Sequence, residues 1–188
     1  MTIRQPPKHH DMPQIWLLSD ARNDAVLERV LRRLPRGSGF VYRHYHLDPE
    51  QRRRRFDRLA TVARSRGHVV ALSAAVPLAR AWGADAIYGP PGRIAGSSGL
   101  LSLATVHSLR ELAAARRANA DLAFASPVFA TDSHPGARSL GAVQVLLLAR
   151  RAGSPVVLLG GMSAARFRAL ARVPHVHGWA AIDGLSAG

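Results

Sequence analysis

The sequence has no cysteine, a single lysine and few aromatic residues, and its apolar runs are short. The absence of cysteine excludes disulfide bonds and thiolate metal sites. No apolar run reaches the roughly 18 residues of a membrane-spanning helix, so we expect a soluble, cytoplasmic protein with no membrane partner. Residues 1–13 are polar, contain prolines and lack an apolar centre, so they are interpreted as a disordered lead and not as a secretory signal.

Acidic residues are scarce as well. The chain has 12 Asp and Glu against 26 Lys and Arg, which gives a formal net charge of +14. This balance permits nucleic acids, anionic membranes or small phosphorylated molecules as partners. A genome composition that favours arginine gives the same excess, and we favour that interpretation. The densest run, Arg52 to Arg55, falls on an expected helix and is interpreted as a solvated outer face, with nucleic-acid binding as the less favoured alternative.

Short apolar runs alternate with helical patterns along the chain. Strands are expected at residues 15–20, 40–43, 68–73, 86–88, 100–105, 122–125, 156–159 and 177–182. Helices are expected at residues 23–34, 48–66, 76–82, 108–118, 142–151 and 164–172. The chain has 188 residues, of which 47% are hydrophobic, so it is long enough for one domain with a substantial core, placed at residues 14–188.

This alternation predicts a parallel sheet of the α/β class. Eight units fit a (β/α)8 TIM barrel, which is short beside the usual length of about 250 residues. Residues 89–99 are too rich in glycine and proline for an ordinary helix, and few residues follow the last strand, so the fourth and eighth helices are expected to be reduced or absent. An open doubly wound sheet is the alternative. No Gly-x-Gly-x-x-Gly follows the first strand, so a dinucleotide-binding fold is not indicated.

A turn with two glycines, Gly160 and Gly161, follows the seventh expected strand, and Ser163 is suited to cap the next helix. Glycines permit a tight turn and leave no side chain above the strand end. Backbone N–H groups at the start of a helix attract phosphate, and TIM barrels often bind phosphate on the loops after strands seven and eight. We therefore predict a phosphate site there that includes Ile182 and Asp183. A tight turn without a ligand is the alternative.

Residues 126–141 form a long segment without expected secondary structure, which indicates function. Its polar groups suit an anionic substrate: Thr131, Asp132, Ser133, His134 and Arg138. A mobile surface loop is the alternative. Arg43, at the end of the second expected strand, is placed to clamp a phosphate or pyrophosphate with two hydrogen bonds. His44 and His46 have the spacing of a metal-ligand pair but lack a third partner, so no metal site is predicted from them.

The long loop and the glycine turn also contain recognisable patterns. Ser126-Pro127-Val128-Phe129-Ala130-Thr131, followed by His134-Pro135-Gly136-Ala137 and Leu140-Gly141, resembles the Gly-Pro-Val-Phe-x-Thr-x-Thr-Lys-Pro-Gly-Ala...Leu-Gly loop of thiamine-phosphate synthases. The stretch from Pro155 to Met162 is similar to the Pro-Val-Val-Ala-Ile-Gly-Gly-Ile strand of that family, and Leu17 to Asp20 resembles its Leu-Ile-Thr-Asp strand. The thiazole tautomerases share the fold and these motifs.

This resemblance implies a TIM barrel that joins a pyrimidine methyl pyrophosphate to a thiazole phosphate, with Mg²⁺, and releases pyrophosphate. It matches Arg43 with the arginine of the family's Gln-x-Arg-x-Lys pyrophosphate motif. It matches Thr131 and Ser133 with loop hydroxyls near the thiazole. It matches Gly161, Ile182 and Asp183 with the cradle for the thiazole phosphate.

The sequence departs from the family pattern at the metal end. Val41 and Tyr45 replace the glutamine and lysine of the pyrophosphate motif. Ser73-Ala74 replaces an Asn-Asp pair, and residues 89–92 lack the second metal carboxylate. Mg²⁺ is therefore expected only if the family activity is retained. Pro127 stands where tautomerases have a catalytic histidine, which leaves His134 as the acid–base candidate.

The leading hypothesis is a divergent family member of thiamine biosynthesis. It binds a thiazole phosphate or a similar small phosphate ester and couples it to a pyrimidine pyrophosphate. The alternatives are a catalytically impaired binding or regulatory barrel and a thiazole tautomerase, and a nucleic-acid binder is less favoured. A homodimer is compatible with the two reduced helices, because a second copy can cover the barrel there.

Overall fold

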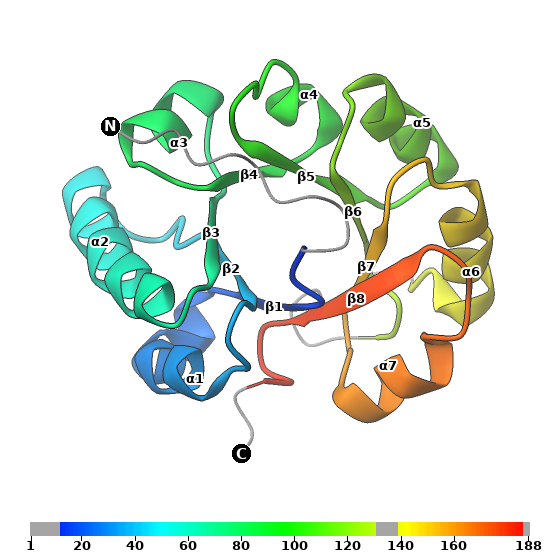
Figure 1. Cartoon of the computed structure of the whole chain (residues 1–188), viewed down its shortest axis with the longest axis horizontal. Coiled ribbons are helices and arrows are strands. Elements are labelled where there is room, and N and C mark those ends of the chain that lie inside the picture. The colour runs from blue at the N-terminus through cyan, green and yellow to red at the C-terminus, as the bar shows by residue number, and fades with distance from the viewer. Residues whose placement is uncertain (1–11, 131–138, 186–188) are drawn as a thin grey trace.

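A computed structural model of the chain describes residues 12–130 and 139–185. These residues form eight parallel strands that close into a barrel in the order β1 to β8, with helices on the outside (Figure 1). The predicted TIM barrel is thereby confirmed, and the open doubly wound sheet is excluded. None of the helices in these residues is long and apolar enough to cross a membrane.

The eight strands are short. They are β1 (Ile15–Leu18), β2 (Gly39–Tyr42), β3 (Val69–Leu72), β4 (Ala86–Gly89), β5 (Leu101–Val106), β6 (Leu122–Ala125), β7 (Val156–Leu159) and β8 (Val176–Ala181). The helices are η2 (Ala21–Val26, a 3-10 helix), α1 (Leu27–Arg33), α2 (Pro49–Ser65), α3 (Val76–Ala81), α4 (Pro91–Ile94), α5 (Leu109–Arg117), α6 (Gly141–Arg151) and α7 (Ala164–Leu170). The first expected helix is therefore two elements, η2 and α1.

The helices predicted to be reduced are so. The helix after β4, α4, has 4 residues, and no helix follows β8 among the described residues, which end at Leu185. Side chains that precede α2, α5 and α7 cap these helices as expected. The Asp48 carboxylate accepts hydrogen bonds from two backbone N–H groups of α2, and Ser108 and Ser163 cap α5 and α7.

The barrel interior is filled by a few large side chains set against small ones. Trp16 and Tyr88 each contact the Phe124 ring edge-on, with centroid distances of 5.4 and 5.2 Å. Gly39 provides the space for Trp16, since a Cβ atom at this glycine would lie 2.1 Å from the indole ring. A second apolar layer packs the strands against the surrounding helices. The narrow interior explains how a chain with few aromatic residues fills its core.

Candidate functional site

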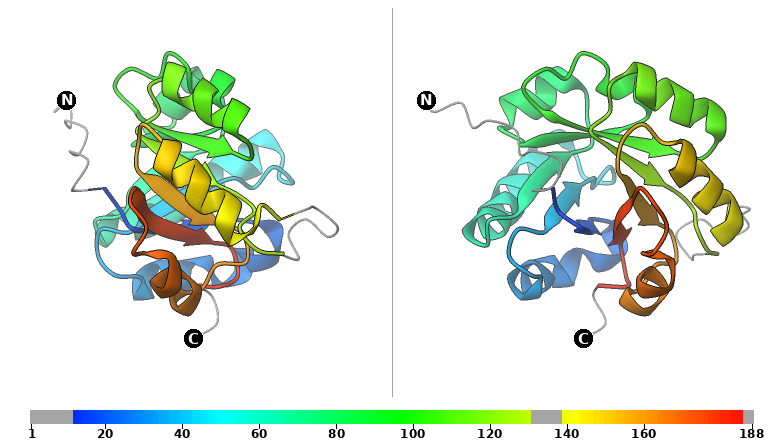
Figure 2. Two further views of the ribbon diagram at one scale, coloured as in Figure 1. Left: turned by 90° about the vertical axis from the view of Figure 1, so that its right-hand side faces the viewer. Right: turned by 45° about the vertical axis from the view of Figure 1, so that its right-hand side comes forward.

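The C-terminal ends of the eight strands face one side of the barrel, the end where TIM barrels place their sites. The left panel of Figure 2 shows the barrel from the side, with the described flanks of the loop after β6 at one end and the first described residues at the other. We call the C-terminal end the mouth. The residues after β1, β2, β3, β7 and β8 meet there and form two distinct halves.

Arg43 lies at the end of β2, as expected, but the protein itself binds its guanidinium. Its Nε donates to the Ser19 carbonyl at 2.9 Å, and its Nη2 donates to the Asp20 carboxylate at 2.8 Å. Its backbone N–H donates to the Ser19 hydroxyl at 2.7 Å. The side chain is only 16% exposed. A phosphate at Arg43 would therefore compete with Asp20 for the same cation.

Asp20 belongs to a line of alternating charges that crosses the mouth from β2 to β8. Its carboxylate caps η2 and accepts a hydrogen bond from Arg22 Nε at 3.0 Å. Arg22 also lies 3.2 Å from the carboxylate of Asp183, just beyond β8. Burial opposes ionisation of Asp20, but the Arg22 hydrogen bonds and the charge of Arg43 outweigh it, so its pKa is lowered. Both carboxylates are therefore engaged by arginines.

Ile182, the first residue beyond β8, is buried, and its carbonyl accepts a hydrogen bond from Asn23 at 3.0 Å. The same Asn23 amide donates to the Leu18 carbonyl at 3.0 Å. Asn23 thereby joins the ends of β1 and β8. These bonds fix the backbone at which the phosphate cradle is predicted.

His44 is buried beneath the mouth with both ring nitrogens engaged. Nδ1 lies 2.9 Å from the Ser19 hydroxyl, and Nε2 lies 2.6 Å from the Asp24 carboxylate. The Ser19 oxygen accepts a hydrogen bond from the Arg43 backbone N–H, so the hydroxyl proton of Ser19 is free to be donated to His44 Nδ1. The imidazole proton is then on Nε2, which donates to the Asp24 carboxylate. Burial lowers the pKa of His44 despite the pull of Asp24. The arrangement leaves no ring nitrogen of His44 for a metal.

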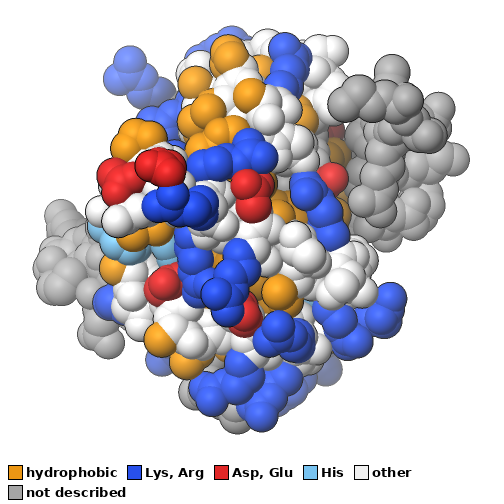
Figure 3. Space-filling model, turned by 90° about the vertical axis from the view of Figure 1, so that its left-hand side faces the viewer, with side chains coloured by type: hydrophobic (Ala, Val, Ile, Leu, Met, Phe, Trp, Pro, Cys, Tyr) orange, Lys and Arg blue, Asp and Glu red, His pale blue; other side chains and the backbone are white. Residues whose placement is uncertain are grey.

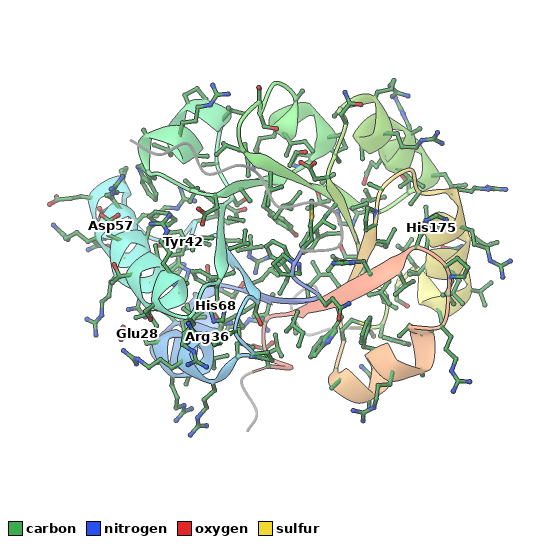
Figure 4. The ribbon with its side chains drawn as sticks, in the orientation of Figure 1. Glu28, Arg36, Tyr42, Asp57, His68 and His175 are labelled. Atoms are coloured by element: carbon green, nitrogen blue, oxygen red, sulfur yellow. The ribbon has the colours of Figure 1, made fainter. Side chains whose placement is uncertain are left out.

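In the arginine run on α2, Arg53 and Arg54 lie on the solvated face predicted for the run, while Arg52 and Arg55 turn inward. Arg52 donates from Nε to the Arg43 carbonyl at 3.0 Å and from Nη2 to the Ser73 carbonyl at 2.9 Å. Arg55 pairs with Asp24 at 2.8 Å and with Glu28 at 2.9 Å. Figure 3 shows acidic side chains among the basic ones on this flank, and Figure 4 shows Glu28 and Asp57 there. The run therefore ties α2 to α1 and to the mouth.

The positions that the family uses for metal are occupied by other contacts. The Tyr45 hydroxyl lies 2.5 Å from the Ser73 hydroxyl, which in turn donates to the Tyr88 carbonyl at 3.1 Å. At the end of β4, Arg93 packs over Gly89, and no acid is present. No group of three or more His, Asp or Glu that could hold a metal occurs in residues 12–130 and 139–185. These residues do not fit a Mg²⁺ site.

The glycine turn after β7 allows another backbone segment to approach. Val128 N–H donates to the Leu159 carbonyl at 2.9 Å, and Phe129 N–H donates to the Gly160 carbonyl at 3.1 Å. A Cβ atom at Gly160 would lie 2.8 Å from Pro127, and one at Gly161 would lie 2.7 Å from the Ala130 carbonyl. Both glycines also have positive φ, +96° and +59°. The two glycines thus allow the segment at 127–130 to lie directly on the turn.

The turns after β7 and β8 also touch, because a Cβ atom at Gly184 would lie 2.4 Å from the Met162 carbonyl. Arg166 of α7 reaches back to this unit, donates to the Gly161 carbonyl and lies 4.8 Å from the Phe129 ring centroid. Sequence reasoning missed Arg166. The one sequence feature that points to Arg166 is its position on the helix that follows the glycine turn.

The predicted loop residues Thr131, Asp132, Ser133, His134 and Arg138 lie outside the described residues, and their roles stay predictions. The two ends of this stretch are described. Leu140 N–H donates to the Pro127 carbonyl at 2.8 Å, and Gly141 N–H donates to the Val128 carbonyl at 3.2 Å. The two described ends of this stretch therefore lie together beside the glycine turn.

A family model described as thiamine monophosphate synthase matches residues 91–185, about half of the chain. The chain belongs to the thiamine monophosphate synthase family. The matched half contains the loop after β6 and the turns after β7 and β8, while the altered pyrophosphate motif lies outside it. A search of proteins with curated functions gives no match.

Solved structures agree with this family in fold. A thiamine phosphate pyrophosphorylase from Pyrococcus furiosus has a TM-score of 0.80 at 21% identity, over 96% of this chain and 90% of that one. FabK from Thermotoga maritima has a TM-score of 0.75 at 16% identity, over 96% of this chain and 61% of that one. A glycerol uptake operon antiterminator regulatory protein from Listeria monocytogenes has a TM-score of 0.63 at 13% identity, over 89% of this chain and 91% of that one. At these identities the likeness shows the fold alone.

Proposed function

We propose that this family member binds a small phosphate ester, thiazole phosphate or a close analogue, in the mouth beside the turns after β7 and β8. The observation that carries the proposal is the joined unit of the loop after β6 and the glycine turn, tied by main-chain hydrogen bonds from Val128 and Phe129. The family match covers this unit. The Pyrococcus furiosus neighbour, a thiamine phosphate pyrophosphorylase, supports the same class of ligand.

In this proposal the backbone of Gly160, Gly161, Ile182 and Asp183 surrounds the phosphate. The Asp183 carboxylate is neutralised by Arg22, which lies 3.2 Å away, so it does not repel the anion in full. Thr131, Ser133 and Arg138 are proposed to contact the remainder of the substrate, and His134 to act as acid or base. Arg43 reaches the ligand only by exchanging its contact with Asp20.

Coupling to a pyrimidine pyrophosphate is the less favoured part of the family activity. A pyrophosphate leaving group is highly charged, and a metal ion supplies several kcal/mol of charge stabilisation in such reactions. Here the Tyr45–Ser73 hydrogen bond and the acid-free end of β4 replace the metal end. We therefore propose a phosphate-ester-binding barrel with impaired synthase chemistry. The tautomerase alternative rests on His134, and a homodimer stays a prediction.

Calorimetric titration with thiazole phosphate tests the cradle. Gly161→Asp places a carboxylate at the turn and should weaken binding by at least about tenfold, since a nearby like charge opposes the phosphate and its Cβ atom displaces the segment at 127–130 that lies on the turn. Ala171→Asp adds the same charge beyond the far end of α7 and should leave the affinity unchanged. Equal affinities of wild type and Gly161→Asp would refute the cradle. Formation of thiamine phosphate from both substrates with Mg²⁺ would refute the impaired chemistry.

A further inference from the structure

The opposite end of the barrel carries a group of arginines that the mouth does not use. Helices α5, α6 and α7 lie in sequence on one flank (Figure 1) and end toward the start of β6, β7 and β8. Their last turns and the residues just beyond them are arginine-rich, and all of these arginines are exposed: Arg116, Arg117, Arg150, Arg151, Arg168 and Arg172. We call this set the arginine face.

Within the described part of the chain, these six side chains form no ion pair, unlike most of the arginines of α2. The acids nearest in sequence to Arg116 and Arg117 already accept hydrogen bonds, since Glu111 accepts the His107 N–H at 2.7 Å and Asp121 accepts the Ser102 hydroxyl at 2.7 Å. Cations at helix C-termini are favoured by the helix dipole. Adjacent arginine pairs end α1 (Arg32 and Arg33), α5 and α6, and among these three helices α5 and α6 follow one another around the barrel.

A hollow of about 350 Å³ lies beside this face, at the connections that lead into β7 and β8. Its lining is Gly153, Ser154, Pro155, His175, Val176 and His177. Arg116 extends along its edge, because a Cβ atom at Gly153 would lie 3.0 Å from Arg116 Nε. Figure 4 shows His175 on this flank. His177 Nε2 donates to the Met12 carbonyl at 3.0 Å, which leaves its Nδ1 without a partner in the described residues.

We propose that the arginine face binds the phosphodiester backbone of a nucleic acid, with a phosphate seated at the hollow beside Arg116. Guanidinium groups pair with phosphate oxygens through two parallel hydrogen bonds. Neighbouring helices lie about 10 Å apart, so three helix ends span about 20 Å. A nucleic-acid strand has one phosphate about every 3.4 Å along its axis, so about six phosphates fit across that length. The surface is thus wider than one small phosphate needs.

The side chains around the face favour a nucleic acid over a membrane or a protein. Membrane-surface helices insert Trp, Phe or Leu beside their basic residues, and protein interfaces have an apolar centre. The exposed large apolar side chains among the described residues are Tyr45, Leu78, Leu109, Val143 and Leu147. None of them is in the last three residues of α5, α6 or α7. The nearest of them in sequence is Leu147, one turn before Arg150 and Arg151 on α6. The helix ends themselves carry charge and no apolar anchor, as is typical of backbone-directed nucleic-acid binding.

Fluorescence anisotropy with a labelled single-stranded RNA of about 20 nucleotides, titrated across NaCl concentrations, tests this proposal. The variant Arg116→Gln/Arg117→Gln/Arg150→Gln/Arg151→Gln should bind at least about tenfold more weakly, because four phosphate contacts are removed. The slope of the logarithm of the association constant against the logarithm of the salt concentration is negative. Its magnitude should decrease by about 0.7 for each lost phosphate contact, and so by about 2 to 3 in total.

The control removes the same charge from the α1 and α2 flank, with Arg29→Gln/Arg53→Gln/Arg54→Gln/Arg58→Gln. It should change the affinity less than threefold and leave the slope nearly constant. Equal weakening by both variants would overturn the proposal, because binding would then follow net charge alone. Absence of salt-dependent RNA binding by the wild type, or stronger binding to phosphatidylserine vesicles than to RNA, would also overturn it. Circular dichroism melting confirms that both variants are folded.

Discussion

The two halves of the barrel mouth are built in different ways. After β1 to β4, polar side chains pair with one another: Arg43 with Asp20, His44 with Asp24, and Tyr45 with Ser73. After β6 to β8, the turns pack backbone on backbone, and glycines supply the space. The family match covers the second half and omits most of the first. The first half is thus held by side-chain bonds within the protein, while the second, which the family match covers, is held by backbone contacts.

The largest expected effect comes from filling the space at Gly160. Gly160→Ala puts a Cβ atom 2.8 Å from the Pro127 backbone at a φ of +96°. Strain at positive φ and the displaced segment should together lower the free energy of unfolding by about 3 kcal/mol. Urea unfolding measures this loss. Gly92→Ala is the control, since a Cβ atom there meets nothing within 4 Å; equal losses would contradict the close approach at the glycine turn.

A smaller effect is expected from Asp24, on the first half of the mouth. Its carboxylate accepts bonds from both His44 and Arg55, so Asp24→Asn leaves the Arg55 cation short of a partner. We expect a loss of about 1 to 2 kcal/mol in urea unfolding, since the site is partly exposed and solvent screens it. Asp57→Asn removes only an exposed pair on α2 and should cost less than about 0.5 kcal/mol. An Asp24 variant as stable as the Asp57 variant would show that the pairing does not hold the first half together.

Acid should destabilise the fold through two buried histidines. Burial lowers the pKa of both His44 and His68 below the usual 6.5, so the folded state keeps them neutral while the unfolded chain takes up protons. Stability is therefore full above about pH 6.5 and falls below it, by up to about 1.4 kcal/mol per pH unit for each histidine. Urea midpoints between pH 8 and 5 measure the slope.

His68 is the better probe of this effect, because it lies away from the mouth. Its Nε2 donates to the Leu31 carbonyl at 2.9 Å, and its Nδ1 has no hydrogen-bond partner among the residues that the structure describes. Figure 4 shows His68 near Arg36. His68→Gln retains a hydrogen-bond donor and removes the titrating group. The free energy of unfolding should then depend less steeply on pH, by up to about 1.4 kcal/mol per pH unit, which is the contribution of one proton. An unchanged slope would show that His68 does not titrate between the folded and unfolded states.

Sequence periodicity was sufficient for the barrel, because each strand and helix has a local pattern. Periodicity could not predict contacts between a side chain or a turn and residues from distant parts of the sequence. The run from Arg52 to Arg55 looks like a solvated face until η2 and α1 bring Asp24 and Glu28 against it. Gly160 and Gly161 indicate a turn, but no local signal shows that residues 127–130 lie on it. Arg43 was placed at its strand end, while its contact with Asp20 depends on the packing of β1 against β2.

The dependence of thiazole phosphate binding on Mg²⁺ tests the contrast between the two halves most directly. Calorimetric titration of the full chain in the presence of Mg²⁺ and in the presence of EDTA compares the same protein with and without the family's metal. We predict the same dissociation constant in both buffers, because the phosphate is held by the backbone after β7 and β8 and the Tyr45–Ser73 bond replaces the metal end. Binding that requires Mg²⁺ would contradict the account.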